Sequence, residues 1–233
     1  MNWDNYKFRC SSLPLLMTMS KNKIDLSETV KSELLKIFIQ EKYNRREIII
    51  NKYLIKGLEQ EDLSIELYNS IYNKKTKKNE RYYSSNQHLF AGTPDLLAYN
   101  LVIDIKSCWD LYSFSKKNAS MGEKDYYYQL LGYMILTKRK KAQLCYTLID
   151  NEESVIAQEL SKYMYNKNLS YEKTKDLIEV EAVEKQIRLN HTFTDIPAKD
   201  RLKLFNYKYS LEEHEKLNLQ LTKCREHLKI LEL

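Results

Sequence analysis

Three charged side chains near the middle of the chain have the types and spacing that metal-assisted hydrolysis needs. Asp104 and Lys106 lie two apart in the run Val102-Ile103-Asp104-Ile105-Lys106, so on a strand both project from one face. Asp95 precedes Asp104 by nine positions, across the turn Tyr99-Asn100, where it can approach that carboxylate. Two adjacent carboxylates repel unless a cation neutralises them, and Mg²⁺ or Mn²⁺ prefers oxygen ligands. A lysine beside such a metal can orient or deprotonate the attacking water, which is the equipment for phosphodiester hydrolysis.

An Asp-x-Lys pair is a weak signal by itself, because a surface ion pair between Asp104 and Lys106 has the same sequence. Its surroundings favour a functional site. Asp95 follows a proline at the start of a predicted strand, and Ile103 and Ile105 point to the opposite, apolar face. The strand therefore places a carboxylate and an ammonium on one face, while its other face is apolar and is expected to be buried.

A helix upstream supplies a third carboxylate. Within the predicted helix 53–72, Glu61 shares its face with Ile65 and Tyr68 and so points inward, whereas Glu59 falls on the solvated face. An inward carboxylate needs a partner, and a metal ion would serve. The alternative interpretation is an acidic helix that only keeps the protein soluble.

A helix downstream carries two polar side chains on one face. Gln129 and Tyr133 are four apart, and Gly132 between them lets another group approach closely. The glutamine can hydrogen-bond a phosphate or a metal-bound water, and the tyrosine can bond a phosphate or stack on a base. Ordinary packing of Tyr133 is the alternative.

The remaining patterns predict an α/β (α+β) protein with a central mixed sheet flanked by helices. Turn residues separate three consecutive antiparallel strands at 81–90, 93–99 and 101–106, followed by strands at 142–149 and, as a late edge strand, 201–209. Helices are predicted at 53–72, 125–137, 152–166 and 171–190, with a polar loop at 108–123. The capping boxes Asp25-Leu26-Ser27-Glu28 and Ser210-Leu211-Glu212-Glu213 open two further helices, with N-caps at Asp25 and Ser210.

The last helix carries an apolar stripe at alternating spacings of four and three, formed by Leu217, Leu221, Cys224, Leu228 and Leu231. The stripe fits a coiled-coil seam, but packing against the chain's own domain is favoured because five residues make a short seam. No internal repeat or domain boundary is visible. We therefore expect a single domain over 1–233, with a core at about 50–150 and a helical C-terminal extension at about 151–233.

Composition narrows the class of protein further. A net charge of +6 and a pI near 8.9 fit a nucleic-acid partner, and the 19 tyrosines offer base-stacking surface, although the codon bias of an AT-rich genome explains many of them. No apolar run approaches the length of a membrane span, so a cytoplasmic protein is expected. The four cysteines have no C-x-x-C spacing, which argues against a zinc finger and an iron–sulfur cluster and predicts free thiols.

Taken together, these motifs resemble the PD-(D/E)xK nuclease superfamily, and most closely its phage-type recombination exonucleases, the YqaJ and lambda exonuclease group. Pro94-Asp95, eight intervening residues and Asp104-x-Lys106 form the superfamily motif, with Asp104 where much of the family has Glu. Gly57-x-x-x-Glu61 is similar to the group's first-helix motif, and Gln129-x-x-x-Tyr133 to its RecB-type helix motif. Arg9-Cys10-Ser11-Ser12 resembles its early Arg/Ser segment.

The resemblance implies roles for these residues. Glu61, Asp95, Asp104 and the backbone carbonyl of Ile105 would hold one or two Mg²⁺, with Mn²⁺ as a substitute, and Lys106 would position or activate the water. Gln129 and Tyr133 would hold the scissile strand. Arg9, Ser12 and Thr93 would hold a terminal phosphate.

The resemblance also implies a restriction-endonuclease-like core with helical N- and C-terminal additions. It implies digestion of one strand of linear duplex DNA from the 5′ end during recombination, in the host cytoplasm if the protein is phage-encoded. A single-strand annealing protein as partner and a homotrimer are further expectations. Three alternatives stay open: an endonuclease of the same superfamily, a catalytically inactive DNA-binding subunit, and a basic protein whose motifs arise by chance.

Overall fold

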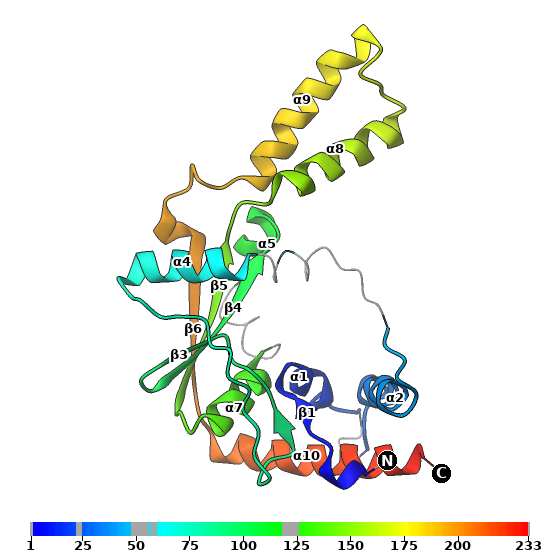
Figure 1. Cartoon of the computed structure of the whole chain (residues 1–233), viewed down its shortest axis with the longest axis vertical. Coiled ribbons are helices and arrows are strands. Elements are labelled where there is room, and N and C mark those ends of the chain that lie inside the picture. Colours follow the sequence, from blue (N-terminus) through cyan, green and yellow to red (C-terminus); the bar gives the residue numbers. More distant parts are fainter. Residues whose placement is uncertain (1, 22–24, 48–55, 57–59, 118–125, 233) are drawn as a thin grey trace.

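A four-stranded mixed sheet forms the centre of the protein (Figure 1). The computed structural model describes residues 2–21, 25–47, 56, 60–117 and 126–232. The sheet has the order β3-β4-β5-β6 and consists of β3 (Leu96–Ala98), β4 (Leu101–Cys108), β5 (Lys141–Leu148) and β6 (Leu202–Lys208). The central pair β4 and β5 is parallel, while β3 and β6 pair antiparallel at the two edges. The predicted mixed sheet and the late edge strand are confirmed.

The alternation of residues along β4 assigns one helix to each face of the sheet. Ile103 and Ile105 pack with Ile65 and Tyr68 of α4 (Glu61–Tyr72), so the predicted apolar backing is confirmed. Val102 on the other face belongs to the main core, which includes α7 (Tyr127–Leu136). Since side chains alternate along a strand, Asp104 faces α7 as Val102 does.

The N-terminal segment and the last helix complete the main core. This segment comprises η1 (Trp3–Asn5), β1 (Phe8–Arg9), η2 (Cys10–Ser12), α1 (Leu13–Leu16) and α2 (Glu28–Tyr43), and the last helix is α10 (Leu211–Ile230). Leu217, Leu221, Cys224 and Leu228 are fully buried in this core, and Leu231 packs against it. The stripe therefore packs within the chain's own domain. A separate two-stranded ladder joins β1 in parallel to β2 (Phe90–Ala91).

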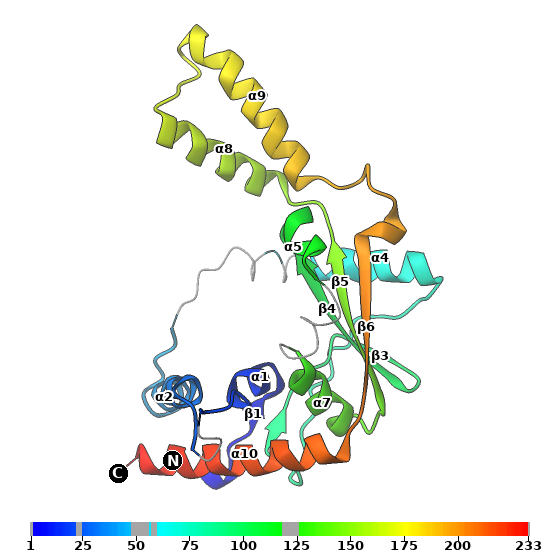
Figure 2. The same cartoon turned by 180° about the vertical axis from the view of Figure 1, so that it is seen from behind.

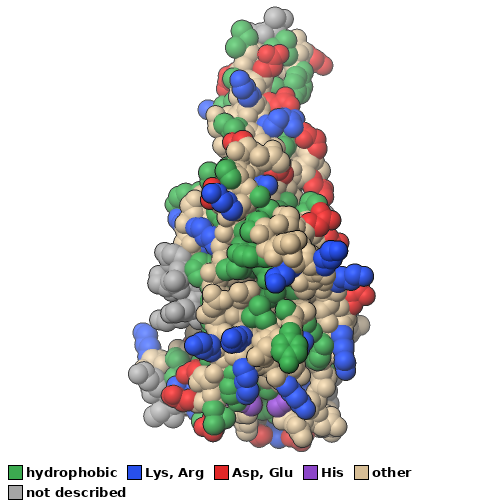
Figure 3. All heavy atoms as spheres, turned by 90° about the vertical axis from the view of Figure 1, so that its left-hand side faces the viewer, with side chains coloured by type: hydrophobic (Ala, Val, Ile, Leu, Met, Phe, Trp, Pro, Cys, Tyr) green, Lys and Arg blue, Asp and Glu red, His purple; other side chains and the backbone are tan. Residues whose placement is uncertain are grey.

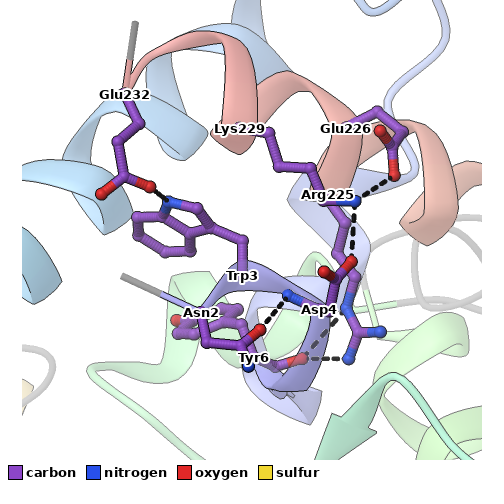
Figure 4. Close-up of polar contacts among 8 residues, drawn as sticks. All are labelled: Asn2, Trp3, Asp4, Tyr6, Arg225, Glu226, Lys229 and Glu232. Carbon is purple, nitrogen blue, oxygen red and sulfur yellow. Dashed lines mark hydrogen bonds and ion pairs between the residues drawn. The ribbon is translucent and has the colours of Figure 1, made fainter.

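Polar contacts fix the N-terminus on α10 (Figure 4). The Trp3 indole donates to the Glu232 carboxylate at 2.8 Å, and the Asp4 carboxylate pairs with the Lys229 ammonium at 2.7 Å. These contacts join residues more than 220 positions apart, so the two ends of the described chain form one layer of the fold.

Two helices project from the sheet as a hairpin (Figures 1 and 2). They are α8 (Glu153–Lys167) and α9 (Thr174–His191), which confirm the helices predicted at 152–166 and 171–190. After the hairpin, η3 (Ala198–Arg201) leads back into β6. On the side seen in Figure 3, Lys and Arg side chains are spread over the body below the hairpin, whereas Asp and Glu side chains gather along one edge of the hairpin.

Three expectations about elements are wrong. Residues 81–90 do not form a strand of the central sheet, because Tyr83 makes only an isolated bridge to Gly92, and Phe90 pairs with β1. The N-cap of α2 is Ser27 rather than Asp25, since the Ser27 hydroxyl accepts from the Val30 amide at 3.3 Å. The predicted loop 108–123 contains the short helix α5 (Leu111–Ser115). Residues 118–123 of that loop lie outside the described residues.

Candidate active site

β3 begins at Leu96, and beyond that point a side chain rather than a strand residue contacts the edge of β4. Leu96 pairs with Ile103, so Asp95 stands beside the next residues of β4. Its carboxylate takes the place of a strand partner there, because Oδ2 accepts a hydrogen bond from the Ile105 amide at 2.7 Å. The N–H and C=O of one strand residue point to the same side, so the Ile105 carbonyl faces this edge too. The carboxylate and the carbonyl predicted as metal ligands are therefore neighbours.

Asp104 lies at the centre of a buried polar cluster. Its side chain is 0% exposed, and its two oxygens are paired with different cationic or amide groups. Oδ2 forms an ion pair with the Lys106 ammonium at 2.6 Å, and Oδ1 accepts from the Gln129 amide at 2.9 Å. The Gln129 amide also lies 3.4 Å from the Tyr133 hydroxyl. The structure thus brings together the Asp-x-Lys motif and the downstream helix motif that the sequence predicted.

Burial and mutual charge shift the acid–base properties of this cluster. Burial, followed by the charge of Asp104, raises the pKa of Asp95 to about 7. Burial by itself would lower the pKa of Lys106, but the carboxylates of Asp104 and Asp95 more than offset it and raise that pKa above its usual value. Burial and the Asp104 charge also raise the pKa of Tyr133. At neutral pH the cluster therefore holds an ammonium, while Asp95 is near its titration point.

Glu61 begins α4, and its side chain is 18% exposed. Its carboxylate forms an ion pair with the Lys78 ammonium at 2.9 Å. Among the described residues, no three His, Cys, Asp or Glu side chains form a group placed to hold a metal ion. The predicted inward face of the helix is correct at Ile65 and Tyr68, but Glu61 is turned toward a lysine that the sequence analysis did not single out.

A row of buried polar residues anchors the start of this helical region to the end of β5. The Lys56 ammonium donates to the carbonyl of Ile149 at 2.9 Å, and the Gln60 amide donates to the carbonyl of Asp150 at 2.6 Å. Burial lowers the pKa of Lys56 to about 8. Sequence reasoning missed this anchor, although the four-residue spacing places both residues on one helical face. Gly57, Leu58 and Glu59 of the predicted motif lie outside the described residues.

The early Arg/Ser segment lies beside the strand that leads into the site. Arg9 pairs with Ala91 in the β1–β2 ladder, which brings the segment next to Gly92 and Thr93. A Cβ added at Gly92 would lie 3.0 Å from the Tyr133 ring and 3.1 Å from the Cys10 Cβ, so the close approach depends on glycine there. Arg9 is exposed, and Ser12 and Thr93 are half-buried. The phosphate-binding role of these three residues stays a prediction.

Gly132 has the close neighbour that the sequence predicted. A Cβ at this position would lie 2.8 Å from the Leu13 side chain and 3.1 Å from the Cys10 sulfur. The N-terminal segment is therefore what approaches α7 here. All four cysteines are buried free thiols, as expected.

A groove of about 1060 Å³ runs between the N-terminal segment and the start of α7. Its lining includes Ser11, Met17, Tyr127 and Gln129. Because Gln129 also donates to Asp104, the groove opens beside the buried carboxylates. Tyr126 lines it too, with its ring 5.4 Å from the Lys106 ammonium. No local pattern distinguishes Tyr126 and Tyr127 from the other tyrosines among the 19 in the chain.

This fold is shared with exonucleases of known structure. No family model and no curated protein sequence matches the chain. The structure of a phage-related exonuclease from Haemophilus somnus 129PT superposes with a TM-score of 0.77 over 97% of this chain and 95% of that chain, at 22% identity. The alkaline exonuclease LHK-Exo from Laribacter hongkongensis gives 0.64 over 96% and 88%, at 12% identity.

The same enzyme in complex with dAMP gives a TM-score of 0.63 over 97% of this chain and 90% of that one, at 12% identity. The class is therefore a nuclease-like α/β fold with a mixed central sheet. Within that class, the chain shares its fold with the phage-related exonuclease and with LHK-Exo, which confirms the fold that the resemblance implied. None of the helices in the described part of the chain has the length and apolar content of a membrane span.

Proposed function

We propose that the protein is a metal-dependent DNA exonuclease. The observation that carries this proposal is the buried contact of Asp104 with both Lys106 and Gln129, at 2.6 and 2.9 Å, on a fold shared with exonucleases. Burying a carboxylate beside an ammonium and a second carboxylate costs folding free energy, and such clusters concentrate at functional sites. Metal-assisted phosphodiester hydrolysis uses all of these groups.

The donor set fits a hard divalent cation. Asp95, Asp104 and the Ile105 carbonyl would hold one or two Mg²⁺ or Mn²⁺, with Glu61 joining them from α4. The raised pKa of Asp95 supports this assignment, because a nearby cation would offset both causes of the shift, the burial of this carboxylate and the charge of Asp104. Bound there, the metal would supply Lewis-acid activation of water and of the scissile phosphate.

The chain's own residues would orient the substrate. Protonated at neutral pH, Lys106 would donate to the attacking water and to a phosphate oxygen, so its raised pKa favours orientation over proton removal. Gln129 would keep Asp104 in position and contact the strand, together with Tyr133. Arg9, Ser12 and Thr93 would bind a terminal 5′-phosphate, and the groove beside Gln129 would receive the strand.

We also propose the finer properties that the resemblance implies. The enzyme would digest one strand of linear duplex DNA from its 5′ end, in a phage recombination pathway in the host cytoplasm. A single-strand annealing protein would be its partner, and the active form would be a homo-oligomer, by analogy a trimer. The whole chain would act as one nuclease domain.

Timed digestion of end-labelled linear duplexes tests this proposal. We expect Mg²⁺-dependent loss of the 5′-phosphorylated strand, no cleavage of a closed circular duplex, and no activity in EDTA. Asp104→Asn, which keeps the side-chain shape, serves as the inactive control. Cleavage of the circle would instead favour an endonuclease, and DNA binding without any Mg²⁺- or Mn²⁺-dependent cleavage would favour an inactive binding subunit.

A further inference from the structure

Each outer carboxylate of the proposed site has its own lysine. Asp104 pairs with Lys106 at 2.6 Å, and Glu61 pairs with Lys78 at 2.9 Å. Asp95, between them, accepts a hydrogen bond from a backbone amide instead. Lys106 belongs to the nuclease motif, whereas nothing in the motif accounts for Lys78. Its position next to a proposed metal ligand therefore needs its own explanation.

The backbone around Lys78 is fixed to the catalytic motif. Lys78 forms an antiparallel bridge with Leu96, the residue after Asp95. The next residue, Asn79, donates from its backbone N–H to the Asp95 carbonyl at 2.7 Å and from its side-chain amide to the Pro94 carbonyl at 2.8 Å. The segment that carries Asp95 therefore also determines where the Lys78 side chain begins.

The loop before Lys78 is fixed to α4 as well. The Asn69 side chain donates to the Thr76 carbonyl at 2.8 Å and accepts from the Thr76 amide at 3.1 Å. The loop thus spans from the end of α4 to the catalytic motif, with contacts at both ends. This arrangement directs the Lys78 ammonium back to Glu61 at the start of α4, and to within 4.0 Å of Asp62.

We propose that Lys78 is a built-in counter-ion of Glu61 that competes with the divalent metal for this carboxylate. The inference rests on the proposed function, because it takes Glu61 as a metal ligand. An ammonium and a metal ion are both cations, so the Glu61 oxygen that pairs with one is less available to the other. Lys78 then stabilises the carboxylates without metal and raises the metal concentration that the site requires.

A Mn²⁺ titration by calorimetry distinguishes competition from support. Lys78 is 41% exposed, so its ion pair contributes modestly and Lys78→Met should fold. We expect Lys78→Met to bind Mn²⁺ about two- to fivefold more tightly than the wild type. The matched control is Lys77→Met, which removes the same charge from the neighbouring exposed residue and should leave the affinity within experimental error.

A double-mutant cycle identifies Glu61 as the group through which Lys78 acts. In a Glu61→Gln background, Lys78→Met should no longer tighten Mn²⁺ binding. In EDTA, Lys78→Met should lower the unfolding temperature slightly, and the increase in that temperature on adding Mn²⁺ should be larger than in the wild type. Lys78→Gln provides a second variant that retains a hydrogen-bond donor without the charge, and it should follow Lys78→Met.

If both Lys78 variants bind Mn²⁺ as tightly as the wild type or less tightly, the proposal that Lys78 competes with the metal is wrong. This holds even if the wild type is an active metal-dependent nuclease. A wild type that binds no Mn²⁺ and cleaves no DNA with either metal would overturn the proposed function itself. These two failures are separate, because the first is measured by binding to a protein that still cleaves DNA.

Discussion

The two halves of the site are held by different physical means. On the strand side, Asp104 is 0% exposed and is fixed by Lys106 and by the Gln129 amide. On the helix side, Glu61 is 18% exposed and is held by Lys78, which is itself 41% exposed. A buried, hydrogen-bonded carboxylate keeps one geometry, whereas a partly exposed ion pair is weaker and can exchange its partner. In the proposed site, the strand half would therefore provide a rigid centre, and the helix half would provide an adjustable ligand.

The largest expected difference between the halves is in catalysis. Asp104→Asn should lower the single-turnover cleavage rate by about 10³-fold or more, because several kcal/mol of metal-dependent stabilisation disappear with it. Glu61→Gln should lower the rate by only about 10- to 100-fold, because the strand carboxylates remain. Rapid-quench assays on a labelled linear duplex measure both rates. Equal losses in the two variants would contradict the distinction between the halves.

The strand half should also make stability depend on pH. The pKa of Asp95 is raised to about 7 in the folded protein, from 3.8, so the folded state binds this proton more tightly than the unfolded state. The resulting stabilisation is fully present below about pH 4 and is lost as the pH rises to 7, by up to about 4 kcal/mol.

Urea unfolding in EDTA between pH 4 and pH 8 measures this effect. The free energy of unfolding should fall more steeply over that range in the wild type than in Asp95→Asn, which has no carboxylate to titrate. Parallel curves for the two proteins would show that Asp95 titrates normally in the folded state.

A smaller effect is expected from the anchor of the helix half. Lys56→Met removes the buried donor to the Ile149 carbonyl, whereas the Trp109 carbonyl keeps the hydrogen bond from the Asn151 amide, and the loss should cost about 2 kcal/mol of unfolding free energy. The start of α4 should then hold Glu61 less firmly, so Mn²⁺ affinity should fall by a few fold. Chemical denaturation and calorimetry measure the two effects. Lys31→Met on α2 is the control, since its ion pair with Glu28 is exposed and should contribute little.

The strand half was predictable because its information is local. The alternation of Asp104 and Lys106 with Ile103 and Ile105 determines which side chains share a face once a strand forms. The helical period likewise predicts that Gln129 and Tyr133, four positions apart, share one face of their helix. The fold class followed from these patterns and from the resemblance that they support.

The rest of the site depends on contacts between distant segments, which no local period records. Lys56 and Ile149 are 93 positions apart, and the pairing of Phe8 with Phe90 joins the N-terminal segment to β2, which precedes Asp95 in the chain. Residues 81–90 contain β-prone aromatic residues, but within this range only Phe90 enters a strand, and it pairs with Phe8 of β1 rather than with the central sheet. The ion pair between Glu61 and Lys78 could not be inferred either, because it depends on how the loop after α4, which carries Thr76 and Lys78, folds back along that helix.

Lys106 provides the most direct test of the account. Its ammonium lies 2.6 Å from Asp104 on the strand half of the site, and the role that we propose for it is to orient the water and the phosphate. The measurement is single-turnover cleavage of a 5′-phosphorylated linear duplex, bound first with Ca²⁺ and started with Mg²⁺, by the wild type and by Lys106→Met. We predict that the variant binds this DNA as tightly as the wild type and cleaves it at least about 100-fold more slowly. Cleavage within a fewfold of the wild-type rate would contradict the assignment of the active site.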